Sequence, residues 1–408
     1  DEAARQMGET AESLSGLAET TRGRTSSAAT SSTQASTNVQ TVASAAEELS
    51  AQAEELRALT ASYALSSGPA APARSASAPA KPKSSLKLLR HDKKAAPVAR
   101  PAKSGEIVTF TCRYDGRDPR QGLRFVDETP DNPRLVWSDS WPDNVHHWFP
   151  CFDYPNDKAT TEIVATVRAG LKVASNGRLV GVFEDPAAGT VTYHWSQELP
   201  HSTYLIFLAA APYVVVRDSY RTLPVNYWVY PGDEAKARPT YGKTPEMIAF
   251  FNETFGFDYP WQKYDQISVP LGGGAESTSA TAMTSRIMVS EADEPDFSAI
   301  GIVSHELAHQ WWGDLITLRS WGHAWMNESF GTYSDYLYHR HDRGDDEGAV
   351  NLQNKLAAYL REAKTRYIRP IVTDRYDKPG DMFDSHSYPK GALVLHMLRA
   401  ILGDEIFF

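Results

Sequence analysis

Residues 305 to 309 read His-Glu-Leu-Ala-His, and this segment limits the possible structure more strongly than any other part of the sequence. In a helix, positions i and i+4 lie on one face about one turn apart, so both imidazoles can bind one metal ion. Glu328, nineteen positions after His309, can add a carboxylate from a second helix. Three protein ligands leave one tetrahedral position open, as in catalytic zinc sites. Glu306 is then the predicted general base for a water molecule at that position.

The residues around this motif indicate two buried helices. Apolar side chains recur over residues 300–312, and a second amphipathic stretch, Trp325 to Tyr338, carries Glu328 near its start. Packing of these two helices would bring the histidines and the carboxylate together. The alternative interpretation is a surface helix with solvated histidines, but the apolar neighbours favour a metal site.

The composition sets broad limits on the class of protein. A length of 408 residues allows two or three domains with hydrophobic cores. The net charge of −10 gives no support for nucleic-acid binding. Two cysteines, Cys112 and Cys151, do not indicate a disulfide-built secreted domain, and the sequence leaves open whether they pair.

The ends of the chain and its hydropathy bear on its compartment. The sequence contains no run of eighteen apolar residues and no signal segment, so membrane association is not indicated. The compartment stays open between cytoplasmic and periplasmic or secreted. Because the chain starts with Asp1 and stops in an apolar run at Phe408, we expect a fragment or a processed form with an incomplete final domain.

Residues 1–65 are predicted to form a helical, coiled-coil-like segment. Apolar residues there recur at alternating spacings of three and four, which is a heptad seam. The seam consists of Val39, Val42, Ala46, Leu49, Ala53 and Leu56. This segment could self-associate with partner helices, or it could be a surface helix of a globular domain. It also resembles the cytoplasmic helical bundle of methyl-accepting chemotaxis receptors, without a recognisable signalling tip.

The rest of the chain divides into three parts, and the fold class is multidomain α+β. Residues 66–104 are a Pro-, Ala- and Lys-rich linker, predicted to be disordered because little apolar surface offsets the entropy of ordering. Residues 105–225 alternate like half-buried strands, starting with 107–114, and predict a mostly antiparallel β domain. Residues 226–408 change from strands to helices, which predicts an α+β catalytic domain. Helices are expected at 244–255, 350–364 and 389–401.

Two further segments carry possible chemistry. Residues 271–277 read Leu-Gly-Gly-Gly-Ala-Glu-Ser, and such glycines let a backbone approach a peptide closely, with Glu276 at the rim. The alternative is a flexible loop with a solvated glutamate. Tyr388 precedes an apolar helix and could donate a hydrogen bond to an oxyanion near a metal, or it could be a core tyrosine.

Together these segments resemble the zinc aminopeptidases of the gluzincin clan, the family that includes aminopeptidase N and leukotriene hydrolase. The resemblance runs from about residue 106 to residue 408 and is strongest over 305–330. Phe149-Pro-Cys-Phe-Asp-Tyr-Pro and Tyr388-Pro-Lys-Gly-Ala add to it. The resemblance implies a β-rich N-terminal aminopeptidase domain and a thermolysin-like zinc catalytic domain, both incomplete in this chain.

The resemblance implies roles for the residues of the metal site. Two histidines and one glutamate would bind one Zn²⁺ per chain. Another glutamate would be the general base, and a tyrosine would stabilise the oxyanion. The zinc ligands would be His305, His309 and Glu328. The general base would be Glu306, and the residue that stabilises the oxyanion would be Tyr388.

The resemblance also implies a substrate-binding segment. Gly273, Gly274, Ala275 and Glu276 would form the exopeptidase motif, which in the family is Gly-x-Met-Glu-Asn and whose glutamate pairs with the substrate's free α-amine. Alanine and serine replace the usual methionine and asparagine, while the glutamate is kept.

Two carboxylates complete the predicted site. Asp139 stands near the position where the family often has a glutamine and a glutamate that help bind the amine, and it could serve instead. Asp335 lies two turns beyond Glu328 on the same helical face, so it is suggested as a partner that orients a zinc histidine.

These observations predict a zinc aminopeptidase that removes the N-terminal residue from peptides with a free N-terminus. Two enzymatic alternatives remain: a zinc endopeptidase, and a hydrolase acting on another amide or an epoxide. A third alternative is an inactive fragment that assembles through its N-terminal coil. The sequence does not indicate the preferred N-terminal residue, because such a pocket is built from scattered side chains.

Overall fold

The computed structural model describes residues 109, 111–117, 119, 121–130 and 133–408. The predicted coil at 1–65 and the predicted linker at 66–104 lie outside the described residues. The elements below all belong to the compact unit that includes residues 116–408. No helix within the described part of the chain is long and apolar enough to cross a membrane.

The predicted strand at 107–114 is wrong for the residues that the structure describes. Thr109 and residues 111–114 are exposed and belong to no strand. Alternation of apolar and polar residues identifies a face, but a strand also needs a neighbouring edge to satisfy its backbone groups. That requirement cannot be read from the segment itself.

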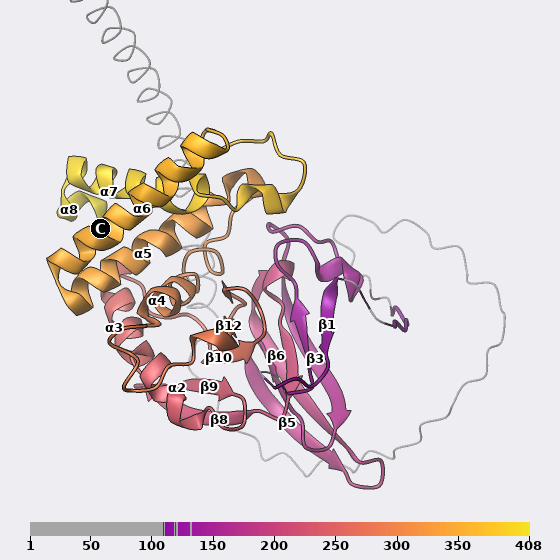
Figure 1. Ribbon diagram of the computed structural model, residues 1–408. Helices are drawn as coiled ribbons and strands as arrows, with labels where there is room; N and C mark the ends of the chain where they lie inside the picture. Colours follow the sequence, from indigo (N-terminus) through magenta and orange to yellow (C-terminus); the bar gives the residue numbers. More distant parts are fainter. Residues whose placement is uncertain (1–108, 110, 118, 120, 131–132) are drawn as a thin grey trace, which may run out of the picture. The chain divides into compact units, whose positions relative to one another are not determined.

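Two antiparallel sheets form the first part of this unit, as the alternating pattern predicts. The first has the strand order β1-β2-β7-β4 and the second the order β3-β6-β5. Their strands are β1 (Gly122–Val126), β2 (Leu135–Asp139), β3 (Lys158–Arg168), β4 (Lys172–Ser175), β5 (Arg178–Asp185), β6 (Thr190–Ser202) and β7 (Leu208–Ala211). Figure 1 shows β3, β5 and β6 as long, twisted strands in magenta.

A third sheet, of mixed direction, links these strands to the helices. Its order is β11-β12-β10-β9-β8, with β10 parallel to both β9 and β12 and with β11 antiparallel to β12. All six residues of β10 are buried, as expected for a central strand covered on both faces. The strands are β8 (Val214–Tyr220), β9 (Leu223–Val229), β10 (Tyr264–Val269), β11 (Gly274–Ala275) and β12 (Ala280–Thr284).

Helices dominate from residue 300 onward, at the orange-to-yellow end of the chain in Figure 1. The prediction for 244–255 is confirmed, since a proline stands in the first turn and Gly256 ends the helix at φ 63. The α-helices are α2 (Glu234–Tyr241), α3 (Thr244–Phe255), α4 (Ile300–Ala308), α5 (Trp325–Arg343), α6 (Asp345–Thr365), α7 (Gly391–Leu402) and α8 (Asp404–Phe407). Short 3₁₀ turns are η1 (Val145–His147), η2 (Thr203–Leu205), η3 (Ser285–Ile287), η4 (Trp321–His323) and η5 (Pro379–Met382), and η6 (His386–Lys390) is a π turn.

Two apolar clusters fix how these layers meet. One packs α3 and α4 against the mixed sheet, with Phe251, Leu307 and Trp311 buried at its centre. The other joins the antiparallel strands to the opposite side of the mixed sheet through Phe207 and Ile267. Both clusters include side chains of β12, the strand next to β11, and the first cluster packs this strand against the histidine helix α4.

Polar contacts between the antiparallel strands and the later chain hold the segment after β11. The Asn176 side-chain amide donates to the carbonyl oxygens of Leu205 and Thr278, at 2.9 and 2.7 Å. The backbone N–H of Gly177 donates to Ser279 Oγ at 2.8 Å. These bonds fix the backbone immediately after Glu276, so the β domain helps to place a predicted site residue.

Candidate active site

The histidine motif lies at the end of α4. Within this buried helix, His305 and His309 stand one turn apart, and His309 is the C-cap residue. The Nδ1 atom of His309 lies 2.8 Å from the carbonyl oxygen of Trp312. Because a carbonyl can only accept, Nδ1 carries a proton, and Nε2 is the nitrogen that can bind a metal once it is deprotonated.

The three predicted ligand atoms converge. His305 Nε2 lies 3.0 Å from His309 Nε2, and Glu328 Oε2 lies 3.5 and 3.4 Å from these two atoms. Zinc bonds of about 2.0–2.1 Å at tetrahedral angles would separate neighbouring ligand atoms by roughly 3.3 Å. The donor set therefore fits a zinc ion in both chemistry and spacing.

A glycine on α5 makes this approach possible. Gly331 follows Glu328 by one helical turn and lies under the two imidazole rings. A Cβ atom at this position would stand 3.0 Å from the His309 ring and 3.1 Å from the His305 ring. This contact is tighter than ordinary packing, so a side chain there would require the imidazole rings to shift.

Glu306 and Glu276 lie beside the ligands, and both are buried. Glu306 packs against the backbone of β11, where a Cβ on Gly274 would overlap its carboxyl group. Oxygen Oε1 of Glu276 has no hydrogen-bond partner among the described residues. A buried carboxylate oxygen without a donor is costly, and it points to a ligand that supplies one.

The carboxyl groups of the site shift one another's pKa. Burial raises the pKa of Glu306 well above its ordinary value, and Glu276 and Glu328 add to the rise. Burial likewise raises the pKa of Glu276 to about 7. Burial also opposes ionisation of Glu328, but His309 and His305 outweigh it and lower the pKa of Glu328 to about 2. The cluster therefore has an excess of acidic groups, which a divalent cation would relieve.

Tyr388 faces the same cluster from the π turn η6. Its ring stacks on the His305 ring, with centroids 5.9 Å apart and planes at 14°. Burial raises the pKa of Tyr388 well above its ordinary value, and the nearby carboxylates raise it further. The phenol is therefore neutral and can donate a hydrogen bond into the site.

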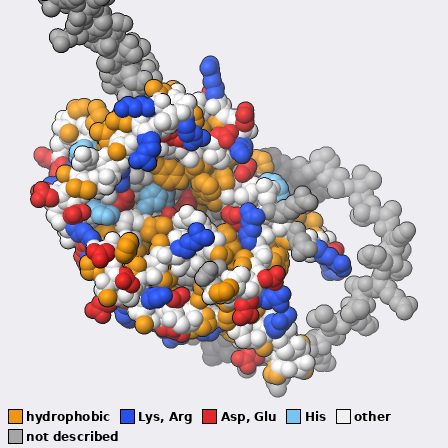
Figure 2. Space-filling model, in the orientation of Figure 1, with side chains coloured by type: hydrophobic (Ala, Val, Ile, Leu, Met, Phe, Trp, Pro, Cys, Tyr) orange, Lys and Arg blue, Asp and Glu red, His pale blue; other side chains and the backbone are white. Residues whose placement is uncertain are grey.

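The ligand atoms, Glu306, Glu276 and Tyr388 line one open cavity of about 780 Å³, bordered by β1, β2, the segment around β11, α4, α5 and η6. Among the described residues its wall includes one basic side chain, Arg124, which binds Asp139 through Nε at 3.1 Å and Nη2 at 2.8 Å. On the face drawn in Figure 2, acidic and basic side chains are interspersed.

The carboxylates of the two remaining predicted residues, Asp139 and Asp335, are paired with basic side chains. Asp139 lines the cavity, but its carboxylate is paired with Arg124. Asp335 binds Lys355 Nζ at 2.6 Å and His339 Nδ1 at 2.7 Å, and it accepts from Asn351. The described contacts of Asp335 therefore tie α5 to α6 and to its own next turn, and none of them reaches a ligand histidine.

Sequence reasoning did not identify Gln310, which connects the histidine motif to the glycine-rich segment. Its Nε2 donates to the carbonyl oxygen of Glu276 at 2.9 Å, and its Oε1 accepts from the backbone N–H of Ser279 at 2.8 Å. Its position directly after His309 was the available signal. The partners are backbone groups some thirty residues away, and these carry no sequence signature.

Two family models match this chain. Residues 24–205 match the peptidase M1 N-terminal domain, and residues 240–408 match the peptidase family M1 domain. "Probable aminopeptidase 1" of Saccharolobus solfataricus is 32% identical over 305 residues, which cover 72% of this chain and 39% of that protein. "Aminopeptidase N" of Streptomyces lividans is 28% identical over 317 residues, which cover 74% and 36%.

A solved structure agrees with these matches. The M1 zinc metallopeptidase of Deinococcus radiodurans, in a mutant form bound to a Tyr-Ser-Ala substrate, aligns with a TM-score of 0.57 at 26% identity. The alignment covers 70% of this chain and 64% of that one. The chain therefore belongs to peptidase family M1, and its cofactor is a single zinc ion. It spans well under half the length of the two curated relatives named above.

Proposed function

We propose that the protein is a zinc aminopeptidase, which hydrolyses the first peptide bond of substrates with a free N-terminus. The observation that carries this proposal is the position of Glu276, a buried carboxylate with an unpartnered oxygen, in the same cavity as Glu306 and the ligand atoms. An ammonium group would supply the missing donor. Anchoring the terminal amine there limits cleavage to the adjacent bond.

The metal would be held by His305, His309 and Glu328. Bound zinc supplies Lewis acidity, which makes water a nucleophile near neutral pH and polarises a carbonyl. Glu306 takes a proton from the attacking water and passes it to the leaving nitrogen. Tyr388 donates to the oxyanion that develops on the carbonyl oxygen.

The glycine-rich segment holds the substrate backbone. Strand β11 pairs with β12 on one side only and is an edge strand of its sheet. An extended peptide can add to such an edge through main-chain hydrogen bonds. Because Gly274 and Ala275 have little or no side chain, the substrate can approach both this edge and Glu306.

Hydrolysis of one short peptide with a free and with an acetylated N-terminus tests the proposal. The purified chain is assayed with one equivalent of zinc, beside Glu306→Ala as a blank for contaminating peptidases. Cleavage of the free form, with release of its first residue, supports an aminopeptidase. Equal cleavage of both forms would instead indicate an endopeptidase, and no cleavage of either would reject catalysis by this chain.

A further inference from the structure

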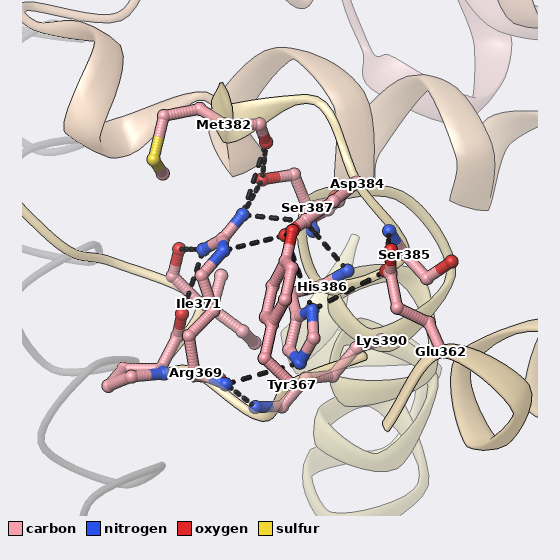
Figure 3. A network of polar contacts seen from close by, with 12 residues as sticks. Glu362, Tyr367, Arg369, Ile371, Met382, Asp384, Ser385, His386, Ser387 and Lys390 are labelled. Atoms are coloured by element: carbon pink, nitrogen blue, oxygen red, sulfur yellow. Dashed lines mark hydrogen bonds and ion pairs between the residues drawn. The ribbon is translucent and has the colours of Figure 1, made fainter. Parts of the chain in front are cut away.

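A second buried polar cluster lies behind Tyr388, and the zinc chemistry does not use it. Glu362, Asp384 and His386 bring three potential metal-binding atoms within 4.8 Å of one another. The cluster already contains a cation, because the Arg369 guanidinium binds both oxygens of Asp384 through Nη2 at 2.6 Å and Nε at 2.8 Å. Figure 3 shows this guanidinium pointing into the centre of the network. We therefore expect a role of this cluster other than metal binding.

The Arg369 side chain also binds several groups of the surrounding backbone. Its Nη1 atom donates to two carbonyl oxygens, and Nη2, which also binds Asp384, lies within hydrogen-bond distance of a third carbonyl oxygen and one hydroxyl. The carbonyls belong to Pro370, Ile371 and Met382, at 2.8, 2.9 and 3.1 Å, and the hydroxyl to Ser387 at 2.9 Å. Both side chains of the ion pair are largely buried, with 13% exposed for Arg369 and 3% for Asp384. A planar guanidinium can make this set of bonds, whereas a lysine ammonium cannot.

Asp384 holds the start of the π turn. Its Oδ1 accepts from the backbone N–H groups of His386 and Ser387 at 2.9 and 3.1 Å, as an N-cap carboxylate does. The backbone N–H of Lys390 reaches the carbonyl oxygen of Ser385 at 3.0 Å and closes the wide turn. Single π turns are rare and often occur at functional sites. Here the turn sets the direction in which Tyr388 leaves the backbone.

The other end of the network reaches the helix that carries a zinc ligand. Ser329, the residue after Glu328, donates from its hydroxyl to the carbonyl oxygen of Ser387 at 2.6 Å. Gly391 packs against this hydroxyl so closely that a Cβ would overlap it. Lys390 Nζ donates to the Arg369 carbonyl oxygen at 2.8 Å. Residues on both sides of Tyr388 are therefore fixed to α5 and to Arg369.

We propose that the Arg369–Asp384 pair is a positioning device for Tyr388, holding its phenol in register with the zinc centre through the π turn. This inference rests on the oxyanion role given to Tyr388 in the proposed function. Misplacement by about 1 Å can cost on the order of 100-fold in rate. Loosening the pair is therefore expected to lower kcat while leaving substrate anchoring at Glu276 unchanged.

The test combines Asp384→Asn and Arg369→Lys with Tyr388→Phe in a double-mutant cycle. Each single variant of the pair is expected to lower kcat about 10- to 100-fold, with KM within about 2-fold and one zinc per chain. In the Tyr388→Phe background the same changes are expected to lower kcat by less than about 2-fold, because the group they position is gone. Arg238→Lys is the matched control, since Arg238 also binds an aspartate and a carbonyl but stands on α2, away from the cavity.

Two outcomes separate the failure of this inference from failure of the proposed function. An unchanged kcat in Tyr388→Phe alone would reject the role of Tyr388, and the inference with it. A lower kcat in Tyr388→Phe supports the role of Tyr388. If Asp384→Asn then lowers kcat in the Tyr388→Phe background as much as in the parent chain, only the positioning role is overturned. Ser387→Ala serves as the milder variant if the others fail to fold, because it leaves the ion pair in place.

Amide hydrogen exchange of the metal-free proteins gives a readout independent of activity. In Asp384→Asn the peptide that contains residues 385–391 is expected to exchange faster than in the parent chain, while peptides of α4 keep their protection. Unchanged exchange over 385–391 would contradict the proposal. Faster exchange over α4 as well would indicate general destabilisation and would equally count against it.

Discussion

The two buried clusters of carboxylates and histidines differ in whether the chain supplies its own cation. At the proposed zinc site, Glu276, Glu306 and Glu328 meet two histidines, and Arg124 in the cavity wall is paired with Asp139. In the network behind Tyr388, Arg369 binds the carboxylate directly. Similar residue types are thus arranged for different purposes.

The pKa shifts follow this difference. Burial raises the pKa of Glu276 and of Glu306. Burial also opposes ionisation of Asp384, but His386 and Arg369 outweigh it, and the pKa of Asp384 falls below its usual range. In a cluster with its own guanidinium and backbone donors the carboxylate charge is compensated, whereas the other cluster needs an external positive charge. Acidic residues close together therefore do not by themselves identify a metal site.

The largest expected effect comes from removing a ligand. In His309→Ala the chain is expected to lose its zinc and all measurable peptidase activity, because only two donor atoms remain. His386→Ala should keep one zinc per chain, since the Arg369 guanidinium already compensates the carboxylate charge of the second cluster. Metal analysis after dialysis, with the melting temperature followed before and after chelation, checks both. Zinc loss in His386→Ala would contradict the distinction between a metal-binding cluster and a cluster compensated by Arg369.

The next effect concerns the general base. Glu306→Gln removes the proton acceptor but keeps the shape and all three ligands, so we expect kcat to fall by about 10²- to 10⁴-fold with zinc retained. Glu253→Gln, at an exposed position on α3, is the control for a charge change. Steady-state kinetics and zinc analysis on the same samples provide the measurement. Full activity in Glu306→Gln would remove this residue from the mechanism.

The third effect concerns the substrate amine. Glu276→Gln leaves the cavity shape but removes the charge that pairs with an ammonium group, and loss of such a partner is worth roughly 100-fold. The ratio of kcat/KM for a free over an acetylated peptide should fall by about that factor. Asp139→Asn should change the ratio by less than about 3-fold, because Arg124 already neutralises that carboxylate. A larger effect for Asp139→Asn would reverse the assignment of the amine anchor.

The sequence predicted best what is local. His305 and His309 are joined by a helical spacing, and α3 has both its end signals in its own sequence, so neither prediction needed the rest of the chain. What escaped prediction depends on contacts over long separations. Gln310 bonds to backbone groups some thirty residues away, and Arg369 bonds to a carboxylate and a turn about fifteen residues away, where no residue pattern marks the partner. The π turn itself has no distinctive composition.

The smallest expected effect is on the stability of the cluster around Arg369 and Asp384, measured as a function of pH. Because the pKa of Asp384 is depressed in the folded chain, its contribution to stability is present above the unfolded-state pKa near 3.8 and is lost as the pH falls through the folded value. We expect Asp384→Asn to be less stable by about 2 kcal/mol at pH 7, from the loss of charge-assisted hydrogen bonds. That difference should begin to shrink below about pH 4, because the unfolded chain takes up a proton there that the folded carboxylate does not. Urea unfolding of the metal-free proteins at several pH values measures it. A difference that stays constant down to pH 2 would mean that the pair stabilises the fold by shape alone, and the contrast with the zinc centre would no longer be electrostatic.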